Sequence, residues 1–226
     1  MEGLKTFPAV ATKVLQIISN EDVRFAQIAS LIEQDPALAA GVLRLANSAM
    51  FPAARSCSDV GQALMRLGTV RVRDVIYAVT TMQMFPDTTG PERTIRDHCA
   101  ATAVLTQYLA NHHPGQVGEH VFLAGLMHDV AKMLLIESDE FTYGGESDVR
   151  LADSVHLAER RVLSFDHAIL GGNVLKRWGV PEPLPTIVAL HHQPAMTYSR
   201  PDVGAEVALL RVASQLEHLL ASKNDD

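Results

Sequence analysis

The dipeptide His128-Asp129 places two ionisable side chains inside an otherwise apolar stretch that reads VFLAGLMHDVAKMLL. This stretch, Val121 to Leu135, is predicted to form one buried helix because apolar residues recur in it at helical spacing: Leu123, Met127, Val130 and Leu134. Burying an imidazole and a carboxylate is costly unless a metal ion, another charge or a hydrogen-bond network pairs with them. The pair therefore predicts either a metal-ligating position or a core histidine whose hydrogen bonds are satisfied locally.

The composition predicts an all-helical protein of one domain or two small ones. The chain has 226 residues, of which 47% are hydrophobic and 5% aromatic, and it is rich in Ala, Leu and Val. Its net charge of −7 argues against direct nucleic-acid binding, which needs a basic surface to displace counterions from phosphates. Any anionic ligand must therefore be held by a local cluster of Lys or Arg.

The sequence also predicts a cytoplasmic protein that does not enter a membrane. Cys57 and Cys99 are too few for a disulfide framework, and the N-terminus lacks the pattern of a signal peptide. No apolar run approaches the roughly 20 residues that span a bilayer.

Caps and breakers divide the chain into predicted helices. Asp35-Pro36 starts one helix, Ser58 is expected to cap another, and Gly68 is expected to close it in a left-handed turn. Breaker residues around Gly90 predict a boundary between helical subdomains at 1–90 and 91–226. Beyond it, periodicity predicts helices over Ile95–Ala110, the Val121 to Leu135 stretch, Val149–Leu163, Asp166–Trp178, Leu184–His191 and Asp202–Ala221, with a loop over Glu137–Ser147 and no strand.

A series of short motifs follows the chain in a fixed order. The first half carries Phe7-Pro8, then DPAL at 35–38, LRLANSA at 43–49 and ALMRLG at 63–68, and the second half carries AGLMHD at 124–129, Asp166-His167, WGVP at 178–181 and HHQP at 191–194. In this order the motifs resemble those of HDOD domains from bacterial signalling proteins, a branch of the HD-domain superfamily. The resemblance runs from about Leu4 to about Leu220. It implies one all-α HDOD domain, in which an N-terminal helical subdomain packs on a degenerate HD-like helical subdomain.

The resemblance also implies a set of metal ligands. HD-domain phosphohydrolases hold one or two metal ions with a histidine, an adjacent His-Asp pair and a distal aspartate, and some members add further histidines. Carried over to this chain, the implied ligands of a divalent transition metal (Fe, Mn, Zn or Ni) are His98, His128, Asp129, His167, His191 and His192. Lys132 lies one helical turn after His128 and is expected to contact a phosphate, so Asp129 and Lys132 are the catalytic candidates.

Three departures from the family pattern argue against hydrolysis. Ser214 stands where the distal aspartate is expected, and serine is a neutral, poor ligand. Ala131 replaces the glycine of the His-Asp motif. Gln193-Pro194 follows the paired histidines without the Gly-Tyr-Pro segment that marks cyclic-dinucleotide phosphodiesterases.

Several of these residues also have simpler structural interpretations. His98 is alternatively a core residue bonded to Asp129 or His128, and one of His191 and His192 is expected to face inward and the other outward. Asp166 is expected to be an N-cap. Cys99 is either a soft ligand or a small buried hydrophobe. Asn47-Ser48 and Arg44 are expected to complete a helix end, and five histidines to be solvated or at helix ends: His112, His113, His120, His156 and His218.

Two function classes follow, with a third between them. The first is a non-catalytic module of bacterial signal transduction that binds a signalling protein or a nucleotide-type ligand through a degenerate HD site. The second is a metal-dependent phosphohydrolase or phosphodiesterase acting on a nucleotide or cyclic dinucleotide. The third is a nucleotide receptor that binds without turnover. Neither the partner nor the oligomeric state follows from the sequence.

Overall fold

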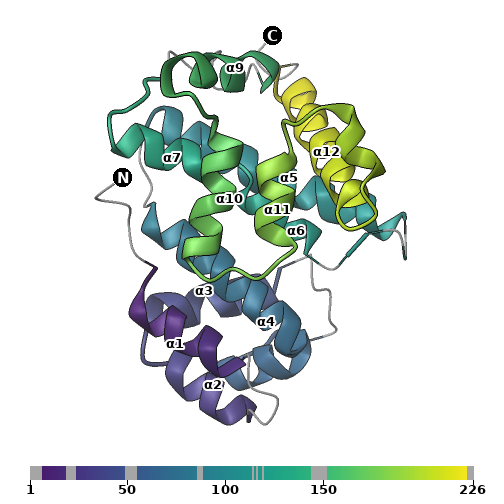
Figure 1. Ribbon diagram of the computed structural model, residues 1–226. Helices are drawn as coiled ribbons and strands as arrows, with labels where there is room; N and C mark the ends of the chain where they lie inside the picture. The colour runs from purple at the N-terminus through teal and green to yellow at the C-terminus, as the bar shows by residue number, and fades with distance from the viewer. Residues whose placement is uncertain are drawn as a thin grey trace. The chain divides into compact units, whose positions relative to one another are not determined.

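The computed structural model describes residues 7–18, 24–48, 55–85, 89–113, 115, 117–118, 120–143 and 152–222 (Figure 1). Every regular element in these ranges is a helix, which confirms the all-α class. The chain forms two compact units, Met1–Pro86 and Asp87–Asp226. This division lies a few residues before Gly90, where the sequence predicts the boundary.

Within its described residues, the first unit contains four helices: α1 (Ala9–Ile18), α2 (Phe25–Ile32), α3 (Pro36–Ala46) and α4 (Val60–Met84). The predicted start of α3 is confirmed, because the Asp35 carboxylate accepts hydrogen bonds of 3.0 Å from the backbone N–H groups of Ala37 and Leu38. Gly68 has φ of 73° and interrupts α4 in the left-handed conformation that the sequence predicts.

The predicted cap of α4 is wrong by one residue. Asp59, not Ser58, accepts the hydrogen bond from the backbone N–H of Gln62, at 2.8 Å. A carboxylate is a stronger acceptor than a hydroxyl at a helix N-terminus, and the Ser58 hydroxyl instead accepts from the side-chain amide of Gln62 at 2.9 Å.

Asn47 has the structural role that the sequence predicts. Its side-chain amide donates to the Cys57 carbonyl at 3.1 Å and its oxygen accepts from the Cys57 N–H at 2.7 Å. The Ser48 hydroxyl donates to the Leu45 carbonyl at 2.8 Å. These bonds close the C-terminal end of α3 and tie it to the chain that leads into α4.

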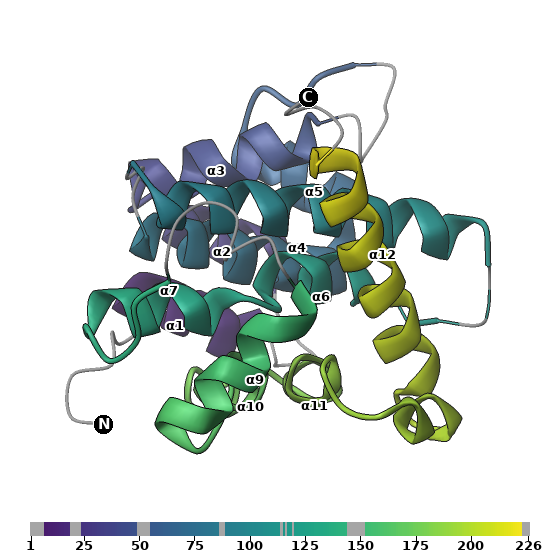
Figure 2. The same cartoon turned by 90° about the horizontal axis from the view of Figure 1, so that it is seen from above.

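The second unit holds all the candidate site residues. Its elements are α5 (Pro91–Asn111), α6 (Val121–Met127), α7 (Val130–Glu137), α9 (Ala152–Leu163), α10 (His167–Arg177), α11 (Leu184–Leu190), the 3-10 helix η1 (Ala195–Ser199) and α12 (Gly204–Ser222). Helix α5 packs against α6 and α12, and α10 packs against α7 and α11 (Figure 2). None of the described helices is both long and apolar enough to cross a membrane.

The helix predicted over Val121–Leu135 is in fact two helices, separated at His128-Asp129. Asp129 has φ of −104° and ψ of 10°, outside helical geometry. The His128 ring donates from Nδ1 to the Gly125 carbonyl at 2.8 Å, and Oδ2 of Asp129 accepts from Lys132 at 2.7 Å. Both residues of the pair thus make side-chain hydrogen bonds to nearby residues where the regular helix is interrupted. The break places both polar residues at the junction between α6 and α7.

Gly125 allows α6 to approach α5 closely. A Cβ atom at this position would lie 2.6 Å from the Cα of Ala103 and 2.6 Å from Oγ1 of Thr106. Because the carbonyl of Gly125 also anchors His128, this close contact fixes the backbone beneath the candidate site.

We expect Gly125→Ala to lower the free energy of unfolding by about 3 kcal/mol, because the added methyl meets a packed backbone. Gly61→Ala in α4 is the matched control, since its Cβ would meet one side-chain oxygen, Asp59 Oδ1, at 3.3 Å. Helix propensity favours alanine there by up to about 1 kcal/mol. Urea unfolding of both variants measures the difference, and equal stability losses would contradict the prediction.

Candidate metal centre

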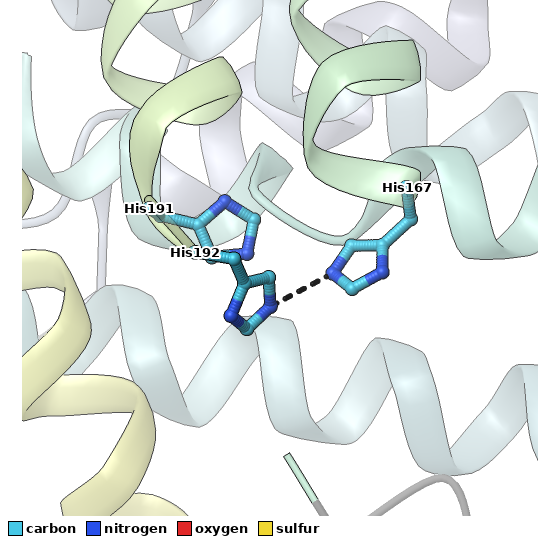
Figure 3. Close-up of side chains that lie close together, drawn as sticks. All are labelled: His167, His191 and His192. Atoms are coloured by element: carbon cyan, nitrogen blue, oxygen red, sulfur yellow. Dashed lines mark hydrogen bonds between the residues drawn. The ribbon is translucent and has the colours of Figure 1, made fainter. Parts of the chain in front are cut away.

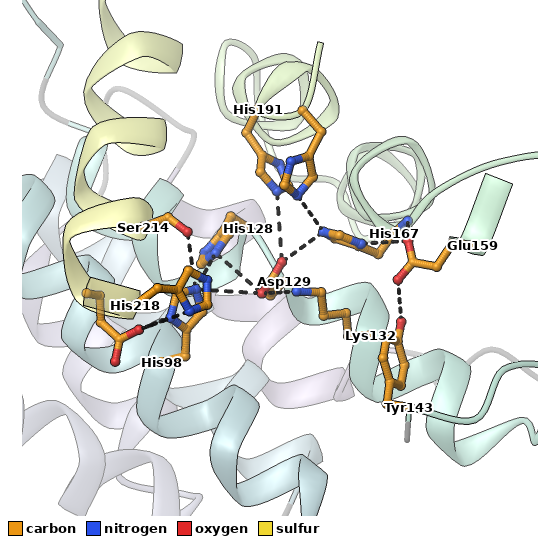
Figure 4. A network of polar contacts seen from close by, with 12 residues as sticks. His98, His128, Asp129, Lys132, Tyr143, Glu159, His167, His191, Ser214 and His218 are labelled. Carbon is orange, nitrogen blue, oxygen red and sulfur yellow. Dashed lines mark hydrogen bonds and ion pairs between the residues drawn. The ribbon is translucent and has the colours of Figure 1, made fainter. Parts of the chain in front are cut away.

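The carboxylate of Asp129 is the centre of a buried polar cluster (Figure 4). Its Oδ2 lies 2.7 Å from Nζ of Lys132, 3.5 Å from Nε2 of His128 and 3.8 Å from Nε2 of His98. All four side chains are buried, and that of Lys132 is 3% exposed. His98 comes from α5, His128 and Asp129 from the α6–α7 junction, and Lys132 from α7.

The other oxygen of Asp129 faces a second group of histidines. Its Oδ1 lies 3.0 Å from Nε2 of His167 and 3.9 Å from Nε2 of His191. His192 joins this group, with Nε2 3.1 Å from Nε2 of His167 (Figure 3). The structure thus brings together all six implied ligands, and the single carboxylate lies between two groups of nitrogens. His191 is buried and His192 partly buried, yet both face the cluster, so the expectation that one would point outward is wrong.

Four of the histidines are held at Nδ1 so that Nε2 faces the cluster. His128 donates to the Gly125 carbonyl at 2.8 Å, and His191 donates to the Val188 carbonyl at 2.7 Å. His167 is held by Glu159 at 2.7 Å and His98 by Glu217. A bond at Nδ1 fixes the ring's tautomer and orientation, which is the usual arrangement around metal-ligating histidines.

The inward-facing nitrogens fit a cation. His98 Nε2 lies 3.2 Å from His128 Nε2, and His167 Nε2 lies 3.1 Å from His192 Nε2. Two unprotonated nitrogens at this distance repel each other unless a proton or a metal ion lies between them. His191 Nε2 is buried with no hydrogen-bond partner. Three sets of donor atoms are each close enough for one ion: His98, His128 and Asp129; His167, His191 and His192; and His98, Glu217 and His218.

Burial and charge set the protonation of these groups. Burial would raise the pKa of Asp129, but His128, Lys132 and His167 outweigh it, and the pKa lies well below its usual range. Burial lowers the pKa of His128 to about 3 and that of His191 well below its ordinary value. These two rings are therefore neutral, as metal ligands must be.

His167 has the opposite shift. Burial and Lys132 favour its neutral form, but Glu159 and Asp129 together raise its pKa. A proton on its Nε2 then bonds to Asp129 when no ion is bound, and a metal ion that binds there must displace this proton.

Glu159 and Tyr143 belong to the site and were missed in the sequence. Glu159 is fully buried, its Oε2 accepts from the backbone N–H and the ring of His167, both at 2.7 Å, and its Oε1 accepts from the Tyr143 hydroxyl at 2.7 Å. Helical spacing did carry a signal, because Glu159 follows the buried Val155 by four residues in α9. Asp166 caps α10 through the Ile169 N–H at 2.9 Å, as predicted, and Arg160 pairs with it.

Two histidines predicted to be solvated or at helix ends lie against the cluster instead. His156 is buried and stacks on His192, with ring centroids 4.4 Å apart, and His218 stacks on His98 at 4.2 Å. His112 and His113 are exposed, as predicted. Cys99 is a small buried residue, burial raises the pKa of its thiol, and it belongs to none of the donor sets found among the described residues.

Ser214 lies at the cluster, next to His98. In the family pattern, this histidine and the distal aspartate bind the same ion. Ser214 is buried, and its Oγ is 3.3 Å from Nε2 of His98. Glu217 follows on the next turn of α12 and contacts the other nitrogen of His98. A cavity of about 380 Å³ borders this side of the site, with a wall that includes His98 and Glu217.

Comparisons with known proteins agree on one family. The sequence model of the HDOD domain matches residues 4–194. An uncharacterized protein of Treponema pallidum (strain Nichols) is 25% identical over 201 residues, which are 84% of this chain and 38% of that protein. The chain therefore spans well under half the length of this relative.

Solved structures show the same fold. An HDOD domain protein of unknown function from Geobacter sulfurreducens is 25% identical, with a TM-score of 0.68 over 94% of this chain and 72% of its own. A proposed phosphohydrolase from Shewanella amazonensis is 23% identical, with a TM-score of 0.75 over 97% of this chain and 78% of its own. At this identity the second likeness concerns the fold alone.

The neutral buried histidines make stability depend on pH. Below the ordinary pKa of 6.5 the unfolded chain takes up protons at His128, His191 and His192, whereas the folded protein does not, since burial lowers all three pKa values. Stability is therefore lost as the pH falls below 6.5, by up to about 1.4 kcal/mol per pH unit for each ring, and His167 offsets part of the loss.

We expect the EDTA-treated protein to lose several kcal/mol of unfolding free energy between pH 7 and about pH 5 in urea titrations. In His192→Gln the unfolding free energy should fall less steeply with pH, because close to one proton fewer is taken up on unfolding. His113→Gln, at an exposed position, should leave the slope unchanged. A stability that is flat or rises toward acid pH would contradict the assignment of neutral rings.

Proposed function

The chain belongs to the HDOD domain family, and we propose that it is a module of bacterial signal transduction whose metal centre binds a ligand without efficient turnover. The observation that carries this proposal is Ser214, which lies 3.3 Å from His98 Nε2 and brings no negative charge to the centre. The remaining implied ligands converge, which supports ion binding. The missing anionic ligand argues against the fixed geometry that hydrolysis needs.

The donor set favours a transition metal. Five imidazoles and one carboxylate suit Fe²⁺, Zn²⁺ or Ni²⁺, and Mn²⁺ less well, whereas Mg²⁺ and Ca²⁺ prefer oxygen ligands. An ion held by these residues would polarise a bound phosphate oxygen and lower the pKa of a bound water. Lys132 is paired with Asp129 inside the cluster and supplies a cation for an anionic ligand.

The ligand that we propose is a nucleotide-type molecule or a signalling protein that presents an anionic group. The proposed setting is the cytoplasm, in line with the two buried free thiols, Cys57 and Cys99.

The second candidate is a metal-dependent phosphohydrolase acting on a nucleotide or cyclic dinucleotide. It is favoured by the second set of donors, His167, His191 and His192, which provides a place for a second ion on the far side of Asp129. EDTA-sensitive hydrolysis of a phosphoester that is lost in His128→Ala would establish this candidate and overturn the first.

Metal content distinguishes a metal centre from a purely structural network. We expect protein purified without an affinity tag to carry transition metal by mass spectrometry, and His128→Ala and Asp129→Ala to lose it. His113→Ala, an exposed histidine, should retain it. A metal-free wild type whose two site variants merely lose stability would contradict the proposal and leave a buried hydrogen-bond network.

Glu159→Gln tests whether the Glu159 carboxylate, which holds Nδ1 of His167, contributes to metal affinity. We expect metal affinity to fall about 10- to 100-fold, because Glu159 fixes the tautomer and raises the basicity of His167. Glu182→Gln is the control, because Glu182 pairs with Lys176 in an exposed ion pair. Isothermal titration with Zn²⁺ gives the affinities, and unchanged binding in Glu159→Gln would place the ion away from His167.

A further inference from the structure

We propose that Ser214 turns one ligand position of the metal centre into a binding site for an oxyanion supplied by the ligand, such as a phosphate or carboxylate group. This inference rests on the proposed function, since it requires that the centre holds a metal ion. To the proposed function it adds the chemical class of the ligand, an oxyanion, and a physical reason why the ion and the ligand bind together.

The first step of the argument is the position of Ser214. Its hydroxyl lies 3.3 Å from Nε2 of His98, which is itself 3.2 Å from Nε2 of His128. An oxygen ligand of an ion held by these two nitrogens would lie beside this hydroxyl. Serine is neutral and coordinates metals poorly, but its O–H group is a good donor to an oxyanion.

The second step is charge. Asp129 is the one carboxylate among the six converging ligands, and Lys132 is paired with it at 2.7 Å. With neutral imidazoles, the side chains that face the ion carry no net charge. A divalent ion would therefore add two buried positive charges, and buried charge is costly unless an anion pairs with it directly.

The carboxylates of Glu217 and Glu159, which lie outside the six converging residues, do not take the place of this anion. Glu217 is held at the Nδ1 side of His98, where it forms a separate donor set with His98 and His218, and Glu159 is held at the Nδ1 side of His167, so neither carboxylate belongs to the set of His98, His128 and Asp129 beside Ser214. Glu159 accepts three hydrogen bonds within the core, from His167 and Tyr143, and cannot reach the ion without breaking them.

The third step is space. The cavity of about 380 Å³ borders His98 and Glu217, and Glu217 lies one helical turn from Ser214 on α12. Ser214 is not on the cavity wall, so the cavity gives room for the body of a small phosphate-bearing ligand on the Nδ1 side of His98, and the oxyanion must pass the His98 ring to reach the Ser214 hydroxyl. The cavity wall carries Arg93 and two carboxylates, Asp97 and Glu217, which favours a ligand with a single oxyanion over a polyanion.

The consequence is that binding of the oxyanion raises the affinity for the metal ion, and binding of the metal ion raises the affinity for the oxyanion. Each supplies the countercharge of the other, so each raises the other's affinity by the same factor. Ser214→Asp should break this linkage, because it supplies the anion from the protein.

Co²⁺ binding to the full chain tests the linkage, with inorganic phosphate as the probe. In wild type we expect phosphate to raise Co²⁺ affinity about tenfold by competition titration and to change the visible absorption of the bound Co²⁺. Ser214→Asp should bind Co²⁺ more tightly without phosphate and respond to phosphate less than about twofold. Ser214→Ala should still show the tenfold response at saturating phosphate, but should need about fivefold more phosphate to reach it, because phosphate loses one hydrogen bond.

Ser222→Asp is the matched control, because Ser222 is an exposed serine on the same helix. It should behave as wild type, and far-UV circular dichroism should show that every variant is folded. A wild type that binds Co²⁺ with the same affinity and spectrum with and without phosphate overturns this inference and leaves the proposed function standing. So does an undiminished phosphate response in Ser214→Asp, whereas a wild type that binds no metal overturns both.

Discussion

The carboxylate of Asp129 is the group on which the second unit depends. Its side chain is 3% exposed and ionised, so it must be surrounded by groups that stabilise negative charge. Lys132 contacts one oxygen and His167 the other, and these two residues come from α7 and α10. Removing either partner would leave a buried charge uncompensated. The need to pair this carboxylate therefore fixes the position of α7 relative to α10.

The histidines around Asp129 are oriented by groups outside the cluster. Two rings are held by backbone carbonyls, those of Gly125 and Val188, and two by carboxylates from α9 and α12. The carbonyl of Gly125 is available because His128 ends α6, and α6 ends there because the polar pair cannot continue a regular apolar helix. Helix packing, helix termination and ring orientation thus have a common cause.

The sequence predicted the fold class, and the family resemblance implied six residues whose side chains converge in the structure; that they bind a metal stays a prediction. The residues that orient these side chains were not predicted. The order and spacing of the motifs were sufficient to select these six residues because the family pattern specifies them one by one. The break at His128-Asp129 was missed because periodicity describes apolar positions and takes no account of local side-chain bonds. Glu159, Tyr143 and Glu217 were missed because each joins the site through a tertiary contact that no sequence motif marks, such as the one between Glu217 and His98.

The clustered histidines are not the arrangement that would make this core most stable. The ring nitrogens of His98 and His128 face each other at 3.2 Å, and burial lowers the pKa values of His128, His191 and His192, so these last three rings oppose folding at acid pH. Apolar side chains of similar volume would fill the same space without that cost. A cation between the nitrogens converts the same geometry from repulsion to attraction, and an anion beside Ser214 would then neutralise the charge that the cation brings. If the centre holds these ions, the stability of the core is coupled to what it binds, which is the physical requirement for the signalling module proposed above.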